Sequence, residues 1–381
     1  MFLKKTVLYI TYLFILFFIA EFCLRIFFPI GSLFFISDNK EYICPSKDPK
    51  LVYELVPNTP NTNCFGLWDI EYPVQKPKDT VRIVLLGDSI AQGIYFNRDE
   101  NYATYLENKL NASGSSKKYE VINLGVIGYD TLKIFEMFKK KGLMYNADIV
   151  IYGYWFNDPL VYQAAELGKV YQLFKNLRAK YIKNLCESKI GFCMEKILDL
   201  ELIKRMILLC DRTTGNGCLD FVYNNFENGY DFNDNLKNDL WVAYERAFKE
   251  RFEKREDAID IHTMGSVYNR PASPDEFNFF LDLVMQMKQL TNKHNSDFYI
   301  LMTPTFEHFV NDPAKGMYSF VDKMCADFDI GLINTVPEFS KYSVQDFKVK
   351  DDDYTHFNTK GHHLVADFIY NYLIENEIIE I

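Results

Sequence analysis

The amino-acid sequence predicts an α/β protein in which helices cover both faces of a mainly parallel sheet. Short apolar segments alternate with helical patterns of similar or greater length on both sides of a different middle region. This alternation is typical of parallel sheets, because parallel strands need crossover connections, usually helices, that bury both faces of the sheet. The sequence also contains an apolar N-terminal segment and a charged middle region that is expected to be mainly helical.

The individual elements are expected in a regular order. Apolar runs predict the strands, and apolar residues at helical spacing predict the helices between them. The expected strands span residues 81–86, 121–123, 148–152, 298–302 and 330–333. The expected helices span residues 101–110, 130–141, 275–294, 319–328 and 361–378. The sequence thus predicts one domain over residues 80–378, with a mainly helical insertion at residues 159–274.

Length and charge exclude several classes of protein. The chain has 381 residues, of which 48% are hydrophobic and 25% charged. That composition suffices for a packed core and excludes wholesale disorder. The formal net charge is −10, and no basic stripe is present that could replace counterions along a phosphate backbone. No nucleic-acid partner is therefore expected.

Residues 1–30 predict a membrane anchor, followed by a linker at residues 31–79. Lys4 and Lys5 precede 15 residues without a charge. A transmembrane helix needs about 20 mostly apolar residues, which are reached only by including Glu21 and Arg25, two residues that can pair across one helical turn. A cleaved signal peptide is the alternative, although Ala20 is followed by Glu-Phe-Cys and not by a small-x-small site. Both interpretations export the rest of the chain, and the lysines keep an anchored N-terminus in the cytoplasm.

Cysteine spacing agrees with an exported protein. Six cysteines flank loops in neighbouring pairs: Cys44 and Cys64, Cys186 and Cys193, and Cys210 and Cys218. Disulfides between neighbours are the simplest of the 15 possible connectivities. A zinc site is the competing interpretation, but no CxxC pair is present and no histidine lies near these residues. Cys325 lies on an apolar helical pattern and is expected to be a buried free thiol.

Ser89 stands where the first predicted strand ends, in the run Gly87-Asp88-Ser89. A serine on a turn between a buried strand and a helix lies at the carboxyl edge of the sheet, where open α/β folds bind ligands. Its own N–H then lies near a helix N-terminus and can face a developing oxyanion. The alternative is a plain turn in which Asp88 or Ser89 only caps the following helix.

Two further strand ends carry candidates for oxyanion binding. Gly125 and Gly128 follow the second strand, and glycines at that spacing let the backbone approach a ligand closely. Gly128 can offer a second N–H. Asn157 follows the third strand, and its side-chain NH₂ is a candidate third donor. Tight turns are the alternative explanation at both places.

Asp353 and His356 precede the last predicted helix. Their i, i+3 spacing brings the carboxylate and the imidazole to one side of a turn. The carboxylate can then fix the histidine tautomer, which leaves the other ring nitrogen to take a serine proton. A solvated loop is the alternative; a calcium loop is not, because the D-x-D-x-D-G spacing is missing.

The order Ser89, Gly128, Asn157 and Asp353/His356 resembles the SGNH (GDSL-type) hydrolase superfamily. The similarity covers residues 80–158 and 275–378, about half the chain. The third block departs from the family pattern Gly-x-Asn-Asp, because Trp155 stands where the glycine would be. The resemblance implies a three-layer α/β/α fold and a serine ester hydrolase. An anchored, exported chain looks like bacterial envelope members, which often act on acyl groups of glycans or lipids.

The resemblance also implies a mechanism that needs no metal and no cofactor. His356 takes the proton of Ser89, which attacks an ester carbonyl, and Asp353 orients His356. The N–H groups of Ser89 and Gly128 and the Asn157 amide hold the oxyanion. A sugar hydroxyl in place of water would make the same site an O-acyltransferase. A non-catalytic envelope binding or assembly protein is the third alternative.

Overall fold

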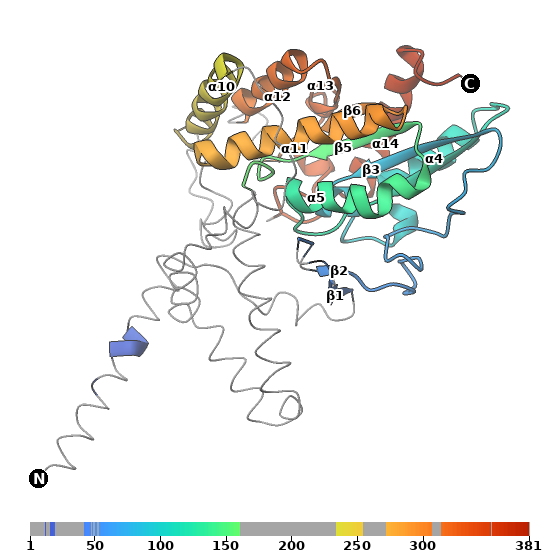
Figure 1. Cartoon of the computed structure of the whole chain (residues 1–381), viewed down its shortest axis with the longest axis horizontal. Helices are drawn as coiled ribbons and strands as arrows, with labels where there is room; N and C mark the ends of the chain where they lie inside the picture. The colour runs from blue at the N-terminus through green and yellow to red at the C-terminus, as the bar shows by residue number, and fades with distance from the viewer. Residues whose placement is uncertain are drawn as a thin grey trace, which may run out of the picture.

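A five-stranded parallel sheet forms the centre of the computed structural model (Figure 1). The structure describes residues 12, 16–19, 42–46, 48, 50, 51, 53–160, 234–253, 272–306, 314–351 and 353–380. The strands are β3 (Thr80–Leu86), β4 (Lys118–Asn123), β5 (Ile149–Tyr154), β6 (Asp297–Met302) and β7 (Gly331–Asn334). Their order in the sheet is β4-β3-β5-β6-β7, so all five predicted strands are present and parallel.

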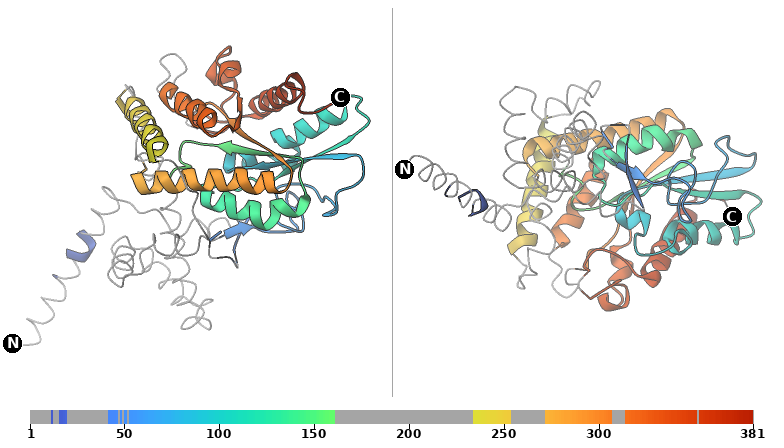
Figure 2. Two further views of the ribbon diagram at one scale, coloured as in Figure 1. Left: turned by 45° about the horizontal axis from the view of Figure 1, so that its top comes forward. Right: turned by 90° about the horizontal axis from the view of Figure 1, so that it is seen from below.

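Helices cover both faces of this sheet (Figure 2). One face carries α4 (Tyr102–Asn111) and α14 (Thr359–Glu375), and the other carries α5 (Thr131–Met137), α11 (Pro274–Lys293) and α12 (Lys315–Asp327). The chain moves in one direction from β3 to β4 and in the opposite direction from β5 to β7. Because parallel crossovers are right-handed, this reversal places α4 on the opposite face from α11 and α12. The observed layers agree with the predicted sheet covered on both sides.

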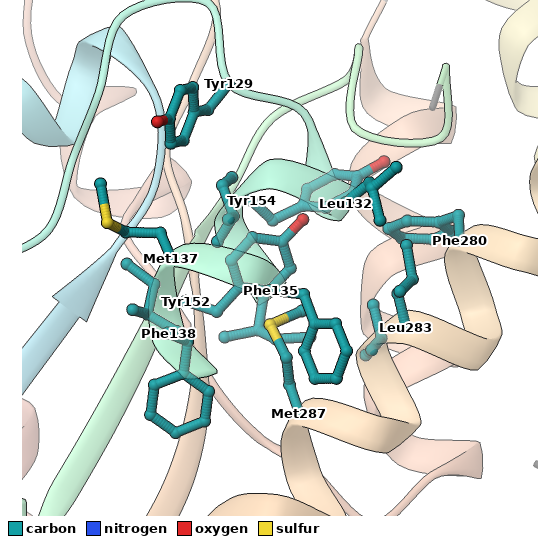
Figure 3. Close-up of a cluster of buried hydrophobic side chains, with 14 of the residues drawn as sticks. Tyr129, Leu132, Phe135, Met137, Phe138, Tyr152, Tyr154, Phe280, Leu283 and Met287 are labelled. Carbon is teal, nitrogen blue, oxygen red and sulfur yellow. The ribbon is translucent and has the colours of Figure 1, made fainter. Parts of the chain in front are cut away.

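Alternate residues of each strand point into two separate hydrophobic cores. Ile83 and Leu85 point to the α4 side, whereas Val84 and Leu86 point to the α5 side, and all four side chains are at most 1% exposed. Figure 3 shows the second core, in which residues of α5 and β5 pack against α11. This two-sided burial explains why the strands read as continuous apolar runs without polar alternation.

Polar side chains cap the N-termini of four helices. Asn101, Asp130 and Asn358 each accept a backbone N–H in the first turn of α4, α5 and α14. Ser273 and Glu276 form a capping box at the start of α11. The predicted helix at 130–141 is α-helical only to Met137 and continues as a π-helical segment, η2 (Phe138–Gly142).

The predicted linker at residues 31–79 contains structure that was not expected. An antiparallel hairpin forms from β1 (Ile43–Pro45) and β2 (Tyr53–Leu55), and its apolar side chains are buried in the core on the α5 side.

Two short helices elsewhere in the chain are α3 (Ser89–Gln92) and α13 (Val336–Phe339). Within the insertion at 159–274, the description covers residues 159 and 160, α10 (Asp234–Glu253) and residues 272–274.

The predicted pairing of Cys44 with Cys64 is wrong. Both are free thiols, because the Cys44 Sγ lies against the Leu55 carbonyl within the hairpin and the Cys64 Sγ lies 3.2 Å from Glu71 Oε2. Cys325 is free and buried, as expected. Cys186, Cys193, Cys210 and Cys218 lie outside the described residues.

The predicted N-terminal anchor falls almost entirely on residues that the structure does not describe. Of residues 1–30, only residues 12 and 16–19 are described, and these are helical. Among the described parts of the chain, no helix is both long enough and apolar enough to cross a membrane.

A buried ion pair joins the N-terminal halves of β3 and β4. The Arg82 guanidinium and the Glu120 carboxylate are both fully buried, with Nε 2.8 Å from Oε2. Arg82 also donates to the carbonyls of Val74 and Tyr145 at 2.9 and 2.8 Å, and to that of Pro73. The pair thus fastens the segment before β3 to the sheet.

We expect Glu120→Ala to lower the free energy of unfolding by about 3–5 kcal/mol, because it leaves the Arg82 charge buried without its counterion. Lys118→Ala is the matched control, because Lys118 binds the same carboxylate at 2.9 Å but is 62% exposed. Its loss should cost below about 1 kcal/mol. Urea denaturation followed by circular dichroism measures both, and equal effects would contradict this account of Arg82.

Candidate active site

The candidate residues meet at the carboxyl edges of three neighbouring strands. Ser89 follows β3, Gly128 follows β4 and Asn157 follows β5. The strand order reverses its direction at β3 and β5, and ligands of open α/β folds bind at such a switch point. The last two candidates, Asp353 and His356, lie just before α14.

The turn after β3 places Ser89 at the carboxyl edge of the sheet. A side chain at Gly87 would place its Cβ 2.7 Å from the Ala91 Cβ, so the turn is compact enough to require glycine. The Asp88 carboxylate accepts the Ile90 N–H at 2.9 Å and caps α3. Asp88 therefore takes the capping role that the sequence left open between the two residues, and the Ser89 hydroxyl remains available to another partner.

A continuous chain of hydrogen bonds joins Ser89, His356 and Asp353. The His356 Nε2 lies 2.8 Å from the Ser89 Oγ, and its Nδ1 lies 2.8 Å from the Asp353 Oδ2. The other Asp353 oxygen accepts the N–H groups of Thr355 and His356, each at 2.9 Å. These backbone bonds fix the carboxylate on the turn, which in turn orients the imidazole toward the serine.

The surroundings keep Asp353 ionised. Burial by itself would raise the pKa of this carboxyl, but hydrogen bonds and charge from His356, together with the two backbone N–H donors, outweigh it. The pKa of Asp353 is accordingly held well below its usual range. An ionised carboxylate in this position is suited to stabilise a neighbouring imidazolium.

The loop after β4 packs tightly against α3. The Asn123 side chain accepts the Gly125 N–H at 2.8 Å and donates to the Ala91 carbonyl at 2.7 Å. A Cβ at Gly125 would lie 2.3 Å from the Gln92 N, so only glycine permits this approach. The Gln92 side chain in turn accepts the Ile127 N–H at 2.7 Å. These contacts carry the loop to Gly128, close to the serine turn.

Three hydrogen-bond donors at this edge remain available to a ligand. The N–H groups of Ser89 and Gly128 donate to no other residue in the part of the chain that the structure describes. The Asn157 side chain likewise makes no hydrogen bond to a described residue, so its NH₂ group is the third candidate donor. The arrangement is therefore suited to an oxyanion that is present only during reaction.

Asp158 supports the strand end that carries Asn157. Its Oδ2 accepts the Tyr152 hydroxyl at 2.6 Å and the Trp155 N–H at 2.9 Å. Burial, and then the charge of Asp88, raise the pKa of this carboxyl well above its usual value. The Trp155 ring stacks on Phe156, and its backbone does not adopt a positive φ, so this position accepts a side chain where the family pattern has glycine.

An aromatic side chain borders His356. The Tyr95 ring meets the His356 imidazole edge-on, with centroids 5.3 Å apart, and Lys350 Nζ lies 4.6 Å from the Tyr95 centroid. Tyr95 is 42% exposed. Among the described residues, no group of three or more histidine, cysteine or acidic side chains is placed to hold a metal ion.

Three residues at the site, Gln92, Tyr95 and Asp158, are not among those predicted from the sequence. Asp158 directly follows Asn157, so its place in the family pattern was a usable signal. Gln92 and Tyr95 act through contacts with residues far away along the chain. No local pattern in the sequence marks such contacts.

If the Asn157 amide donates to the transition-state oxyanion, Asn157→Ala should lower kcat by about 10²–10³-fold with little change in KM. Hydrolysis of p-nitrophenyl acetate measures both constants. Asn376→Ala, at the opposite end of α14 from His356, is the control and should leave kcat unchanged. A decrease in kcat of less than tenfold in Asn157→Ala would mean that the asparagine is not an oxyanion donor. The departure at Trp155 would then reflect an oxyanion site built from other groups.

Solved esterase structures show a distant similarity to this chain. Among solved structures, an acetyl xylan esterase shares 15% identity, with 77% of this chain and 100% of that chain covered and a TM-score of 0.39. The esterase EstA from Pseudoalteromonas sp. shares 12%, covering 78% and 99%, with a TM-score of 0.38. The lipase/acylhydrolase from Enterococcus faecalis shares 12%, covering 78% and 96%, with a TM-score of 0.35. These scores are too low to support any argument about function.

The family assignment rests on the sequence itself. No curated protein matches this chain significantly. Residues 83–369, well over half of the chain, match the pattern of the GDSL-like lipase/acylhydrolase family. This match spans Ser89, Gly128, Asn157, Asp353 and His356. The chain therefore belongs to the GDSL-like lipase/acylhydrolase family, within the SGNH hydrolase superfamily.

Proposed function

We propose that this protein is a serine ester hydrolase with Ser89 as nucleophile, His356 as general base and Asp353 as the residue that orients the base. The observation that carries the proposal is the hydrogen-bonded chain from Asp353 through His356 to the Ser89 Oγ, with 2.8 Å at each of its two links. A nucleophile within hydrogen-bond reach of an oriented base is the arrangement that acyl transfer requires.

The reaction proceeds in two steps at this site. As the Ser89 Oγ attacks the ester carbonyl, its proton moves to the His356 Nε2, and collapse of the tetrahedral intermediate expels the alcohol, which takes that proton. A water molecule then gives a proton to His356 and attacks the acyl carbonyl. Collapse of the second tetrahedral intermediate releases the acid, and His356 returns the proton to the Ser89 Oγ. The donors Ser89 N–H, Gly128 N–H and the Asn157 amide stabilise the oxyanion in both steps.

We expect Ser89→Ala to abolish esterase turnover while the protein stays folded, because no neighbouring group can replace the nucleophile. Ser340→Ala is the control, since this exposed hydroxyl only donates to the Pro337 carbonyl. The measurement is p-nitrophenyl acetate hydrolysis by wild type and variants. More than a few per cent of residual activity in Ser89→Ala would remove Ser89 from its role.

The same assay separates hydrolysis from the other two candidate activities. Turnover that needs an added glycan acceptor, with the acyl group found on its hydroxyl, would make the protein an O-acyltransferase. An intact wild-type protein with no turnover under either condition would indicate a binding or assembly protein. We favour hydrolysis because the family is one of lipases and acylhydrolases.

We also propose that the catalytic domain is exported and held at the membrane by residues 1–30, with O-acyl esters of envelope glycans or lipids as its substrates. The support is the apolar segment that follows Lys4 and Lys5. Within it, the helical residues Leu16, Phe18 and Ile19 are exposed, as expected of side chains that would face lipid.

The exposed thiol of Cys64 allows the topology to be tested. A membrane-impermeant maleimide should label Cys64 in intact cells that carry the protein, and the difference from a Cys64→Ser variant isolates this site. In cells with an outer membrane, that membrane is first made permeable, so that the reagent reaches the outer face of the cytoplasmic membrane. Labelling of Cys64 only after lysis of the cytoplasmic membrane would rule out export.

A further inference from the structure

The hairpin before the catalytic domain is docked onto the segment that follows the Gly128 loop. Leu51, Tyr53 and Leu55 are buried in the core on the α5 side. Acidic hairpin residues meet lysines of η2, with Lys140 Nζ 2.9 Å from Asp48 and Lys141 Nζ 2.7 Å from Glu54. Figure 1 shows β1 and β2 beside α5. Burial and charge together hold the hairpin in one place.

Tyr53 of this hairpin contacts the loop directly. Its hydroxyl donates to the Ile127 carbonyl at 2.6 Å, and the Tyr129 hydroxyl donates back to the Tyr53 carbonyl at 2.6 Å. The two rings pack edge to face, with centroids 5.4 Å apart. The hairpin thus contacts the loop on both sides of Gly128, but of these two bonds only the one from the Tyr53 hydroxyl engages the Ile127–Gly128 peptide.

The bond to Ile127 controls the direction of the Gly128 N–H. The Ile127 carbonyl and the Gly128 N–H belong to one planar peptide unit, and no cis peptide is present in the described chain. In a trans peptide these two groups point in opposite directions. When Tyr53 holds the carbonyl on the hairpin side, the N–H must face the opposite side.

Glycine makes such a restraint necessary. Gly128 has φ +70°, and a residue without a Cβ can rotate the preceding peptide at little cost. Ile127 N is held by Gln92 of α3 at 2.7 Å. Gln92 thus binds the Ile127 N–H and Tyr53 binds the Ile127 carbonyl. These two hydrogen bonds hold the orientation of the peptide between Ile127 and Gly128. A Cβ at Gly128 would lie 2.8 Å from the Tyr53 Oη.

We infer that Tyr53 is a positioning residue for the reaction: it holds the Ile127–Gly128 peptide so that the Gly128 N–H faces the oxyanion. This inference rests on the proposed function. It gives the hairpin, which lies outside the residues matched by the family pattern, a part in catalysis. Donors that are fixed in place before reaction stabilise the oxyanion most strongly, because they need no reorganisation.

The test is Tyr53→Phe, which keeps the ring and its packing and removes only the hydroxyl. The matched control is Tyr129→Phe, which removes a hydrogen bond of equal length from the same interface but leaves the Ile127 carbonyl bound. With p-nitrophenyl acetate, Tyr53→Phe should lower kcat by about 10–100-fold and change KM less than about twofold. Tyr129→Phe should keep kcat within about threefold of wild type. Thermal unfolding of both variants establishes that they are folded.

Three results would overturn the inference alone, each with an active wild type. These are an unchanged kcat in Tyr53→Phe, an effect confined to KM, and equal losses of kcat in the two variants. A folded wild type without turnover would instead overturn the proposed function, and the inference with it. The two failures are therefore distinguishable in one experiment.

Discussion

The loop after β4 lies so close to α3 that a Cβ at Gly125 would stand 2.3 Å from the Gln92 N. This close approach is the constraint on which the site depends. It lets Asn123 bind the Ala91 carbonyl and Gln92 bind the Ile127 N–H. Ser89 and the Gly128 N–H are thereby carried by two segments that are hydrogen-bonded to each other. The geometry proposed for acyl transfer thus rests on the packing of backbone against backbone.

Electrostatics distinguish the carboxyl groups around this packed centre. Asp353 is held ionised by His356 and by two backbone N–H donors. Asp158 lies fully buried, and its pKa is raised well above the usual value, first by that burial. Asp353 is thus placed to stabilise an imidazolium, whereas Asp158 supports the Asn157 strand end through the Tyr152 hydroxyl and the Trp155 N–H. Environment, not residue type, separates the two roles.

Segments outside the sheet also reach the site. The hairpin holds the Gly128 loop through Tyr53. On the other side, α10 of the insertion places the Arg251 guanidinium 5.1 Å from the centre of the Phe156 ring, one residue before Asn157. Two segments that are not part of the strand-and-helix repeat therefore contact the loops that carry Gly128 and Asn157, the proposed oxyanion donors. The predicted linker and insertion are both connected with the site.

The sequence by itself determined the five strands, the main helices and the identity of the residues that meet at the sheet edge. These features are local, since apolar runs, helical spacing and turn residues report the conformation of a few neighbours. It also led to the wrong pairing of Cys44 with Cys64, because cysteine spacing does not reveal where each thiol points.

Only the tertiary structure decided how distant residues meet. Ser89 and His356 are 267 residues apart, yet their side chains lie 2.8 Å from each other. Tyr53 reaches Ile127 across 74 residues in the same way. Such contacts follow from strand order and from the packing of whole elements, which no short stretch of sequence encodes. The sequence therefore determined which groups are available for chemistry, and the packing of the sheet edge decided which of them act together.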